Sequence, residues 1–107
     1  MLVNMRIMNK NIAKINKLIS DKKYSRALSL LKKTNVEATA DVFEFKRLEL
    51  VCLVKLSQHK LAIIKAKEVL ANVACKRDEV NVLMVLSQEL AKVNRISESI
   101  ACLAQII

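Results

Sequence analysis

Apolar residues recur along this chain at the spacing of one face of an α-helix. In the stretch NIAKINKLIS, Ile12, Ile15, Leu18 and Ile19 follow one another at i, i+3, i+6 and i+7, which places them on one stripe of a helix. After the polar stretch SDKK, the run YSRALSLLKK repeats this pattern. The same spacing predicts four further helices, over about 41–56, 58–73, 78–93 and 96–107.

Short polar hinges separate the two helices of each predicted pair. The stretches SDKKYSRAL, KLSQHKLAI and KVNRISESI share one layout, in which a small residue follows shortly after the second helix begins. These small residues are Ala27, Ala62 and Ser99, at separations of 35 and 37 residues. Helices that cross closely leave no room there for a longer side chain. Leucines before the hinges recur with the same offsets, at Leu18, Leu53 and Leu90.

A repeat of about 34 residues built from helix, turn and helix is typical of stacked helical solenoids. At these residues the chain resembles the tetratricopeptide repeat (TPR) family, and the third copy, VLMVLSQELAKVNRISESIACLAQII, carries the resemblance best. The sequence departs from the family pattern in three ways: the early large aromatic residue, the hinge glycine and the closing proline are all missing. Asn11, Lys46 and Leu83 stand at the aromatic positions, and Lys22, Ser57 and Asn94 at the glycine positions.

The resemblance implies an all-α fold, a right-handed stack of about three antiparallel helix-turn-helix pairs that forms a TPR-like α-solenoid. It implies one domain over 1–107, with repeats at about 9–35, 41–73 and 78–107. A compact helical bundle with the same period is the alternative. Asparagine tolerates the left-handed conformation that ends many helices, so we expect Asn94 to replace glycine directly. We expect Lys22 and Ser57 to continue as bent helix or as a tighter last turn.

Composition supports helices and adds a strong positive charge. Glycine and proline are absent, whereas sheets usually need them in tight turns. The net charge is +9, and residues 1–40 carry nine Lys and Arg against Asp21 and Glu37. A basic N-terminal third can attract nucleic acid, an anionic membrane or an acidic partner, or it can simply be a solvated lysine face.

The alternative from another functional class is therefore a basic helical protein associated with nucleic acid. No aromatic residues interleave with the cations for base stacking, and no motif places them on a recognition helix. This alternative gains if the basic residues converge on one exposed face. The residues it would use are Lys10, Lys14, Lys17, Lys22, Lys23, Arg26, Lys32 and Lys33.

The residues that carry chemistry elsewhere form no catalytic or metal-binding pattern here. His59 is the only histidine, and no Ser/Asp or Cys/Asp set accompanies it. Cys52, Cys75 and Cys102 form no CxxC pair, which favours reduced thiols, with Cys75 the most exposed. We therefore predict no enzyme, no cofactor and no metal.

The chain contains no sequence signal for the membrane or for secretion. No run approaches the roughly 18 apolar residues of a membrane helix, and the opening MLVNMRIMNK lacks the features of a secretory signal. We therefore expect a cytoplasmic protein.

TPR arrays bind peptides or helices of other proteins on a concave face lined by the first helix of each pair. One mode of the family grips a C-terminal carboxylate, and its positions fall here on Ile12, Asn16, Leu48, Asn81 and Val85, of which Asn16 alone has the family's residue type. We therefore expect a different ligand, an amphipathic or extended peptide with acidic flanks. The predicted groove is an apolar trough with basic edges, lined by Ile12, Asn16, Ile19, Arg47, Val51, Val54, Lys55, Asn81, Met84 and Gln88, with Asn9 and Lys92 at its ends.

The sequence thus predicts a protein–protein interaction module: a scaffold, an adaptor, a secretion-type chaperone, or the TPR part of a larger regulator. The trough can also be filled by the N-terminal MLVNMRIM or by a second copy of the chain. The last helix ends ACLAQII, with no charge after Glu98, so self-association through this helix, or a longer parent protein, stays open. The sequence does not identify the partner or the pathway.

Overall fold

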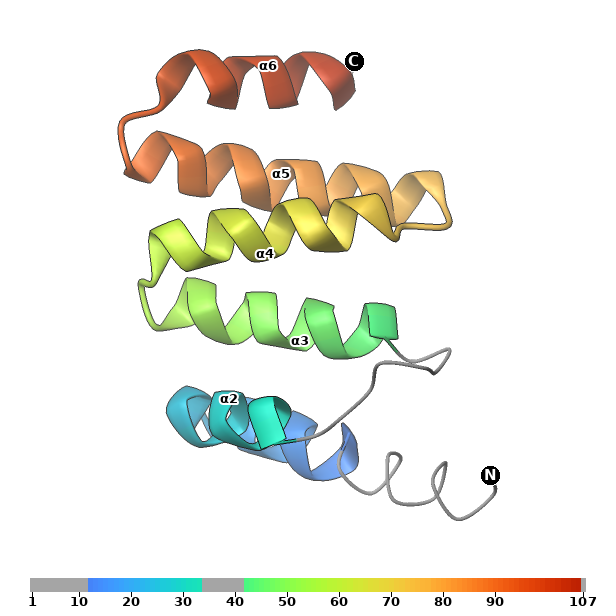
Figure 1. The fold of residues 1–107 in the computed structure, drawn as a ribbon, viewed down its shortest axis with the longest axis vertical. Coiled ribbons are helices and arrows are strands. Elements are labelled where there is room, and N and C mark those ends of the chain that lie inside the picture. Colours follow the sequence, from blue (N-terminus) through green and yellow to red (C-terminus); the bar gives the residue numbers. More distant parts are fainter. Residues whose placement is uncertain (1–11, 34–41, 107) are drawn as a thin grey trace. The chain divides into compact units, whose positions relative to one another are not determined.

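The computed structural model of the protein describes residues 12–33 and 42–106, and all regular structure in these ranges is α-helical (Figure 1). A helix at 12–20 is followed by α2 (Tyr24–Lys33), α3 (Val42–Lys55), α4 (His59–Ala71), α5 (Lys76–Lys92) and α6 (Ile96–Ile106). The predicted all-α class is confirmed for this part of the chain. The predicted bounds of the last four helices agree to within two residues.

The chain divides into two compact units, Met1–Leu56 and Ser57–Ile107. The first contains the helix at 12–20, α2 and α3, and the second contains α4, α5 and α6. The boundary falls between the two helices of the repeat predicted at 41–73. The single domain over 1–107 and the right-handed stack stay predictions.

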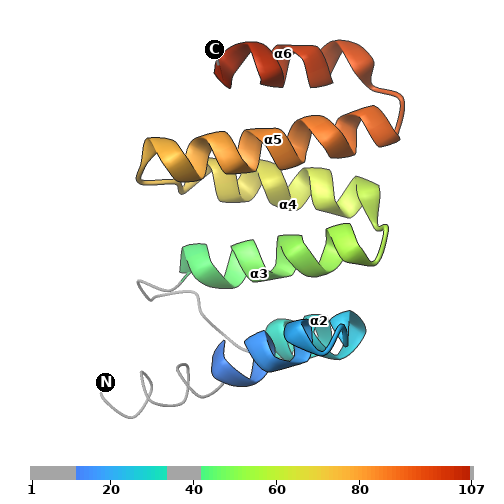
Figure 2. The ribbon, with the colours of Figure 1, turned by 180° about the vertical axis from the view of Figure 1, so that it is seen from behind.

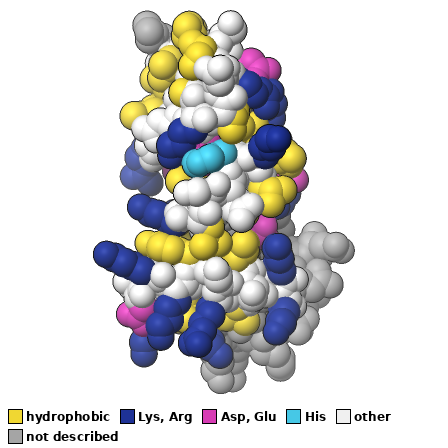
Figure 3. Space-filling model, turned by 90° about the vertical axis from the view of Figure 1, so that its left-hand side faces the viewer, with side chains coloured by type: hydrophobic (Ala, Val, Ile, Leu, Met, Phe, Trp, Pro, Cys, Tyr) yellow, Lys and Arg dark blue, Asp and Glu magenta, His cyan; other side chains and the backbone are white. Residues whose placement is uncertain are grey.

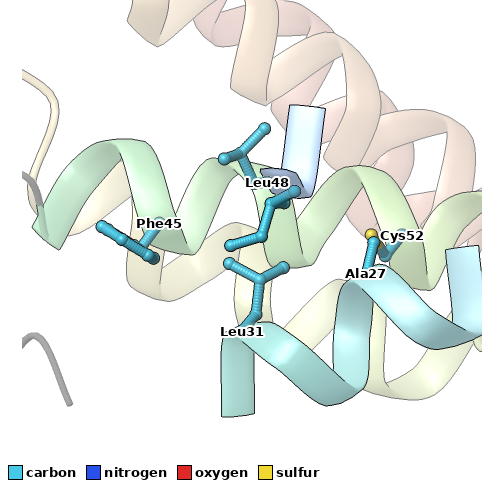
Figure 4. Close-up of a cluster of buried hydrophobic side chains, with 6 residues drawn as sticks. Ala27, Leu31, Phe45, Leu48 and Cys52 are labelled. Atoms are coloured by element: carbon cyan, nitrogen blue, oxygen red, sulfur yellow. The ribbon is translucent and has the colours of Figure 1, made fainter. Parts of the chain in front are cut away.

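The first unit is held together by apolar side chains from all three of its helices. In Figure 4, Phe45, Leu48 and Cys52 of α3 lie against Ala27 and Leu31 of α2. Ile15, from the helix at 12–20, completes this buried cluster. On α2 the two buried residues are four positions apart, which puts them on one helical face.

In the second unit α5 lies between α4 and α6, and each helix runs antiparallel to the one before it (Figures 1 and 2). Because α5 packs on two neighbours, it buries residues on two sides. A polar contact joins α5 to α6: the Ser99 hydroxyl donates a hydrogen bond of 2.8 Å to the backbone carbonyl of Ser87. Apolar core residues of this unit are Ala62, Ile63, Ala66 and Val69 on α4, Val82, Leu83, Leu86 and Leu90 on α5, and Cys102 on α6.

The small residues of the three aligned stretches are all buried. Ala27 and Ala62 are 0% exposed and Ser99 is 7% exposed. A longer side chain at these positions would have to displace the neighbouring helix, because protein interiors are closely packed. The burial predicted from their spacing is therefore confirmed.

The three hinge residues share one backbone conformation. Lys22, Ser57 and Asn94 have φ values of 62°, 58° and 67°, which is the left-handed region that glycine adopts without strain. The prediction for Asn94 is confirmed. The prediction that Lys22 and Ser57 continue as bent helix or a tighter turn is wrong: these two residues adopt the left-handed conformation despite a cost of about 1–2 kcal/mol.

Backbone hydrogen bonds show how this conformation ends a helix. The N–H of Lys23 donates to the carbonyl of Leu18 at 2.8 Å, and the N–H of Lys22 donates to Ile19 at 3.0 Å. Two equivalent bonds end α5: the N–H of Arg95 donates to the carbonyl of Leu90, and the N–H of Asn94 donates to the carbonyl of Ala91. This is the hydrogen-bonded cap in which one left-handed residue satisfies the last carbonyls and turns the chain sharply. The next helix can then begin within two residues, which explains why hinges without glycine still adopt it.

Candidate functional site

In the first unit, the groove residues predicted on the helix at 12–20 lie on one face, because Ile12, Asn16 and Ile19 are spaced by four and three residues. Asn16 is exposed, whereas Ile12 and Ile19 are half-buried and pack against the buried cluster of this unit. The apolar part of this face therefore belongs in part to the protein's own core.

The groove residues predicted on α3 have mixed surroundings. Val51 and Val54 are half-buried and Lys55 is exposed. Arg47 donates two hydrogen bonds to the Glu44 carboxylate, at 3.1 and 2.6 Å. Both side chains are partly exposed, so this ion pair contributes little to stability. It does neutralise one of the cations predicted to line the edge of the trough.

In the second unit, Asn81, Met84 and Gln88 are exposed at spacings of three and four residues along α5. They form one face of the helix, and the Met84 side chain is 46% exposed. The residues Val82, Leu83 and Leu86 of the same helix are buried, so the exposed face is not part of the unit's core. The structure thus brings together the three predicted residues of this helix. A single groove that includes all ten predicted residues stays a prediction.

Large apolar side chains are exposed on all three helices of the second unit. On α6, Ile96, Ile100 and Leu103 are 48%, 61% and 45% exposed, and their i, i+4, i+7 spacing places them along one side of the helix. Self-association through α6 stays a prediction. In the described part of the chain, all six exposed large hydrophobic residues belong to this unit: Leu61, Ile64, Met84, Ile96, Ile100 and Leu103.

His59, the only histidine of the sequence, lies beside the carboxylate of Glu89. His59 Nδ1 lies 3.1 Å from Glu89 Oε1, and Lys92 Nζ lies 2.9 Å from Glu89 Oε2. The Glu89 side chain is 1% exposed. Its Oε2 atom is close enough to Lys92 Nζ for an ion pair, but it has no hydrogen-bond partner among the described residues. His59 is the first residue of α4, so the carboxylate lies near the positive end of this helix. Figure 3 shows the histidine at the surface, in cyan.

This arrangement fits a structural role for His59, since a buried carboxylate needs partners. The sequence did not reveal Glu89, because it stands among the buried residues of α5 and its partner is 30 residues away. The catalytic sets considered for His59 in the sequence were Ser/Asp or Cys/Asp sets of recognisable spacing, and such a pattern does not include this pair.

The cysteines are placed as predicted: Cys52 and Cys102 are buried and Cys75 is exposed. Burial raises the pKa of the Cys52 thiol to about 11, and the nearby Glu49 adds to this effect. Burial also raises the pKa of Cys102. Both side chains therefore remain thiols at neutral pH and are poor nucleophiles.

Residues 12–33 and 42–106 contain no group of three or more His, Cys, Asp or Glu residues arranged to hold a metal ion. None of the helices in these ranges has the length and apolar character required to cross a membrane.

The basic residues considered for nucleic acid are exposed wherever the structure describes them, at Lys14, Lys17, Lys22, Lys23, Arg26, Lys32 and Lys33. Asn9, Lys10, Asp41 and the N-terminal MLVNMRIM lie outside the described residues.

Comparison of the chain with protein-family models, curated proteins and solved structures gave no match. The TPR resemblance therefore stays a prediction based on the repeated residues.

Proposed function

We propose that the chain is a protein–protein interaction module, a scaffold, adaptor or chaperone-like protein, in which α5 of the second unit contacts a peptide or helix of the partner. The observation that carries the proposal is the exposed face of α5, where Met84 lies between Asn81 and Gln88. A methionine side chain adapts its shape to different apolar partners. Two flanking amides supply hydrogen bonds to a polar backbone.

The exposed apolar side chain of Met84 supports an interaction role for α5. Exposed apolar surface on a protein can mark a site of protein interaction. Burying one exposed aliphatic side chain stabilises a complex by up to about 1.5–3 kcal/mol. A partner with an apolar anchor, in an amphipathic helix or an extended segment, fits this face. The proposal includes no catalytic activity.

A TPR-like arrangement is the fold that we propose for this module. It is supported by left-handed hinge residues at 22, 57 and 94 and by buried small residues that follow each hinge at a constant distance. The same features would arise if each helix pair were a copy of one hairpin. A cytoplasmic location is part of the same proposal.

A nucleic-acid-associated protein is the second candidate, favoured by the seven exposed cations in 12–33. Two features weigh against it. Tyr24, the only aromatic residue of this segment, is half-buried and packs against the core of its unit, and base stacking requires accessible rings. The apolar side chains of Leu18 and Leu30 also lie beside three of these cations, Lys14, Arg26 and Lys33.

The proposed face is tested by affinity capture with the full chain and two matched variants. Met84→Asp places a carboxylate on the exposed face of α5, and Ile64→Asp places one on α4 at a similarly exposed apolar position, 55% against 46% exposed. We expect the wild type and Ile64→Asp to capture the same proteins, and Met84→Asp to capture at least about tenfold less of them. A tenfold loss of affinity corresponds to about 1.4 kcal/mol of binding free energy. Mass spectrometry identifies and quantifies the captured proteins.

Both variants should keep the far-UV circular dichroism of the wild type, because both positions are exposed. Equal capture by Met84→Asp and the wild type would reject the α5 face as the binding site. Loss of the same proteins with both variants would show that the effect is not specific to this face.

A further inference from the structure

The first unit contains an open hollow of about 400 Å³ between the helix at 12–20 and α2. Lys14 and Leu18 line it from one helix, at i and i+4. From α2 it is lined by Arg26, Leu30 and Lys33, at i, i+4 and i+7, so both helices contribute one face. Ser25 and Ser29 complete the lining with two hydroxyl groups.

The hollow combines an apolar floor with a cationic rim. Leu18 and Leu30 are half-buried and pack against the buried cluster of the unit, so their positions are fixed from below. Lys14, Arg26 and Lys33 are exposed. Long cationic side chains lay their apolar stems along such a surface and keep the charge outward.

No carboxylate is among the residues that line this hollow in the described part of the chain. Three like charges around one concavity repel one another and raise its affinity for anions. A second hollow of about 410 Å³ shares Ser25 and Arg26 with the first and adds Lys22 and Lys23 to its lining. Figure 3 shows Lys and Arg side chains gathered over the part of this surface where α2 lies in Figure 1.

We propose that this hollow binds an acidic peptide segment of a partner protein, with an aliphatic side chain on the Leu18–Leu30 floor and carboxylates on Lys14, Arg26 and Lys33. Charge complementarity selects the carboxylates, and arginine holds a carboxylate with two parallel hydrogen bonds. The apolar floor selects a peptide over nucleic acid, because a phosphodiester backbone has no apolar group to place there. This second site is separate from the α5 face and does not depend on it.

Fluorescence anisotropy with the full chain tests the site. The probe is a fluorescein-labelled synthetic peptide of repeated Glu-Glu-Leu units, and the comparison peptides replace Glu by Gln or Leu by Ser. We expect the Glu-Glu-Leu peptide to bind more tightly than either comparison peptide, and its affinity to fall as salt is added. Equal binding of the Leu-to-Ser peptide would overturn the role of the floor.

Charge-reversal variants on α2 locate the bound peptide. Arg26→Glu and Lys33→Glu alter the rim. Lys32→Glu changes the net charge of the protein by the same amount, but at an exposed position that lines neither hollow. We expect each rim variant to weaken binding about tenfold or more, the scale of a lost charge-assisted hydrogen bond, and Lys32→Glu to retain it within about twofold. Equal losses for all three variants would overturn the proposal, because binding would then depend only on net charge.

Two competitors complete the experiment. Duplex DNA and vesicles of anionic phospholipid are titrated against the bound peptide at the same ionic strength. Failure of both to displace it supports a peptide site. Displacement at lower concentration than unlabelled peptide would overturn the proposal in favour of nucleic acid or membrane. Because Met84 lies in the other unit, a negative result here leaves the capture experiment on α5 unaffected.

Discussion

Phe45→Ala is expected to lower the free energy of unfolding of the first unit by about 3–5 kcal/mol, the usual cost of removing a buried aromatic side chain. Phe45 is 1% exposed and belongs to the cluster formed with Leu48, Cys52, Ala27 and Leu31. Alanine leaves a cavity that these neighbours fill only in part. Urea unfolding followed by circular dichroism measures the loss.

Phe43→Ala provides the matched control, because Phe43 is the other phenylalanine of the same helix and is only half-buried. Its loss should be clearly smaller. Similar losses for both variants, or a loss below about 1 kcal/mol for Phe45→Ala, would contradict the packing of α3 on α2.

Ala62→Leu is expected to destabilise the second unit by about 1–3 kcal/mol, because three extra carbon atoms must enter a closely packed position. Ala62 is 0% exposed and lies on α4, which packs against α5. Relief requires either an unfavourable rotamer of the leucine or a wider separation of the helices. Thermal and urea unfolding of the full chain report this loss.

Ala71→Leu adds the same atoms to the same helix at an exposed position. It should change stability by less than about 0.5 kcal/mol, as surface substitutions usually do. A neutral result for Ala62→Leu would reject the alignment of the small residues as helix-crossing positions.

Much of the fold could be predicted from apolar spacing alone. The spacing of apolar residues by three and four positions predicted the helices, because an amphipathic stripe is the main signal of a helix that packs on a core. The recurrence of Ala27, Ala62 and Ser99 after each hinge predicted their burial. The exposure of Asn81, Met84 and Gln88 followed from their position opposite the buried stripe of α5.

Other features depend on contacts between distant residues. Glu89 is a charged residue that would be assigned to the surface, and its burial becomes understandable only with His59 placed beside it. Lys22 and Ser57 have no intrinsic preference for a left-handed backbone. Nothing in the type of either residue therefore predicted the φ values of 62° and 58° that they adopt. The hollow at Arg26 requires two helices to be placed side by side.

The proposed repeat of one hairpin rests on the left-handed hinge residues at 22, 57 and 94, and glycine substitution tests them directly. Lys22→Gly and Ser57→Gly are each expected to raise the free energy of unfolding by about 0.5–1 kcal/mol, because relief of strain exceeds the entropic cost of glycine. Asn94→Gly should have a smaller effect, since asparagine tolerates this conformation. Ser29→Gly, at an exposed position inside α2, is the control and should lower stability by about 0.5–1 kcal/mol.

The decisive measurement is urea unfolding of Ser57→Gly beside Ser29→Gly, since the same chemical change is made at a hinge and within a helix. A rise for Ser57→Gly together with a fall for Ser29→Gly is the predicted result. A fall of similar size in both variants would contradict the left-handed hinge, and with it the repeated hairpin.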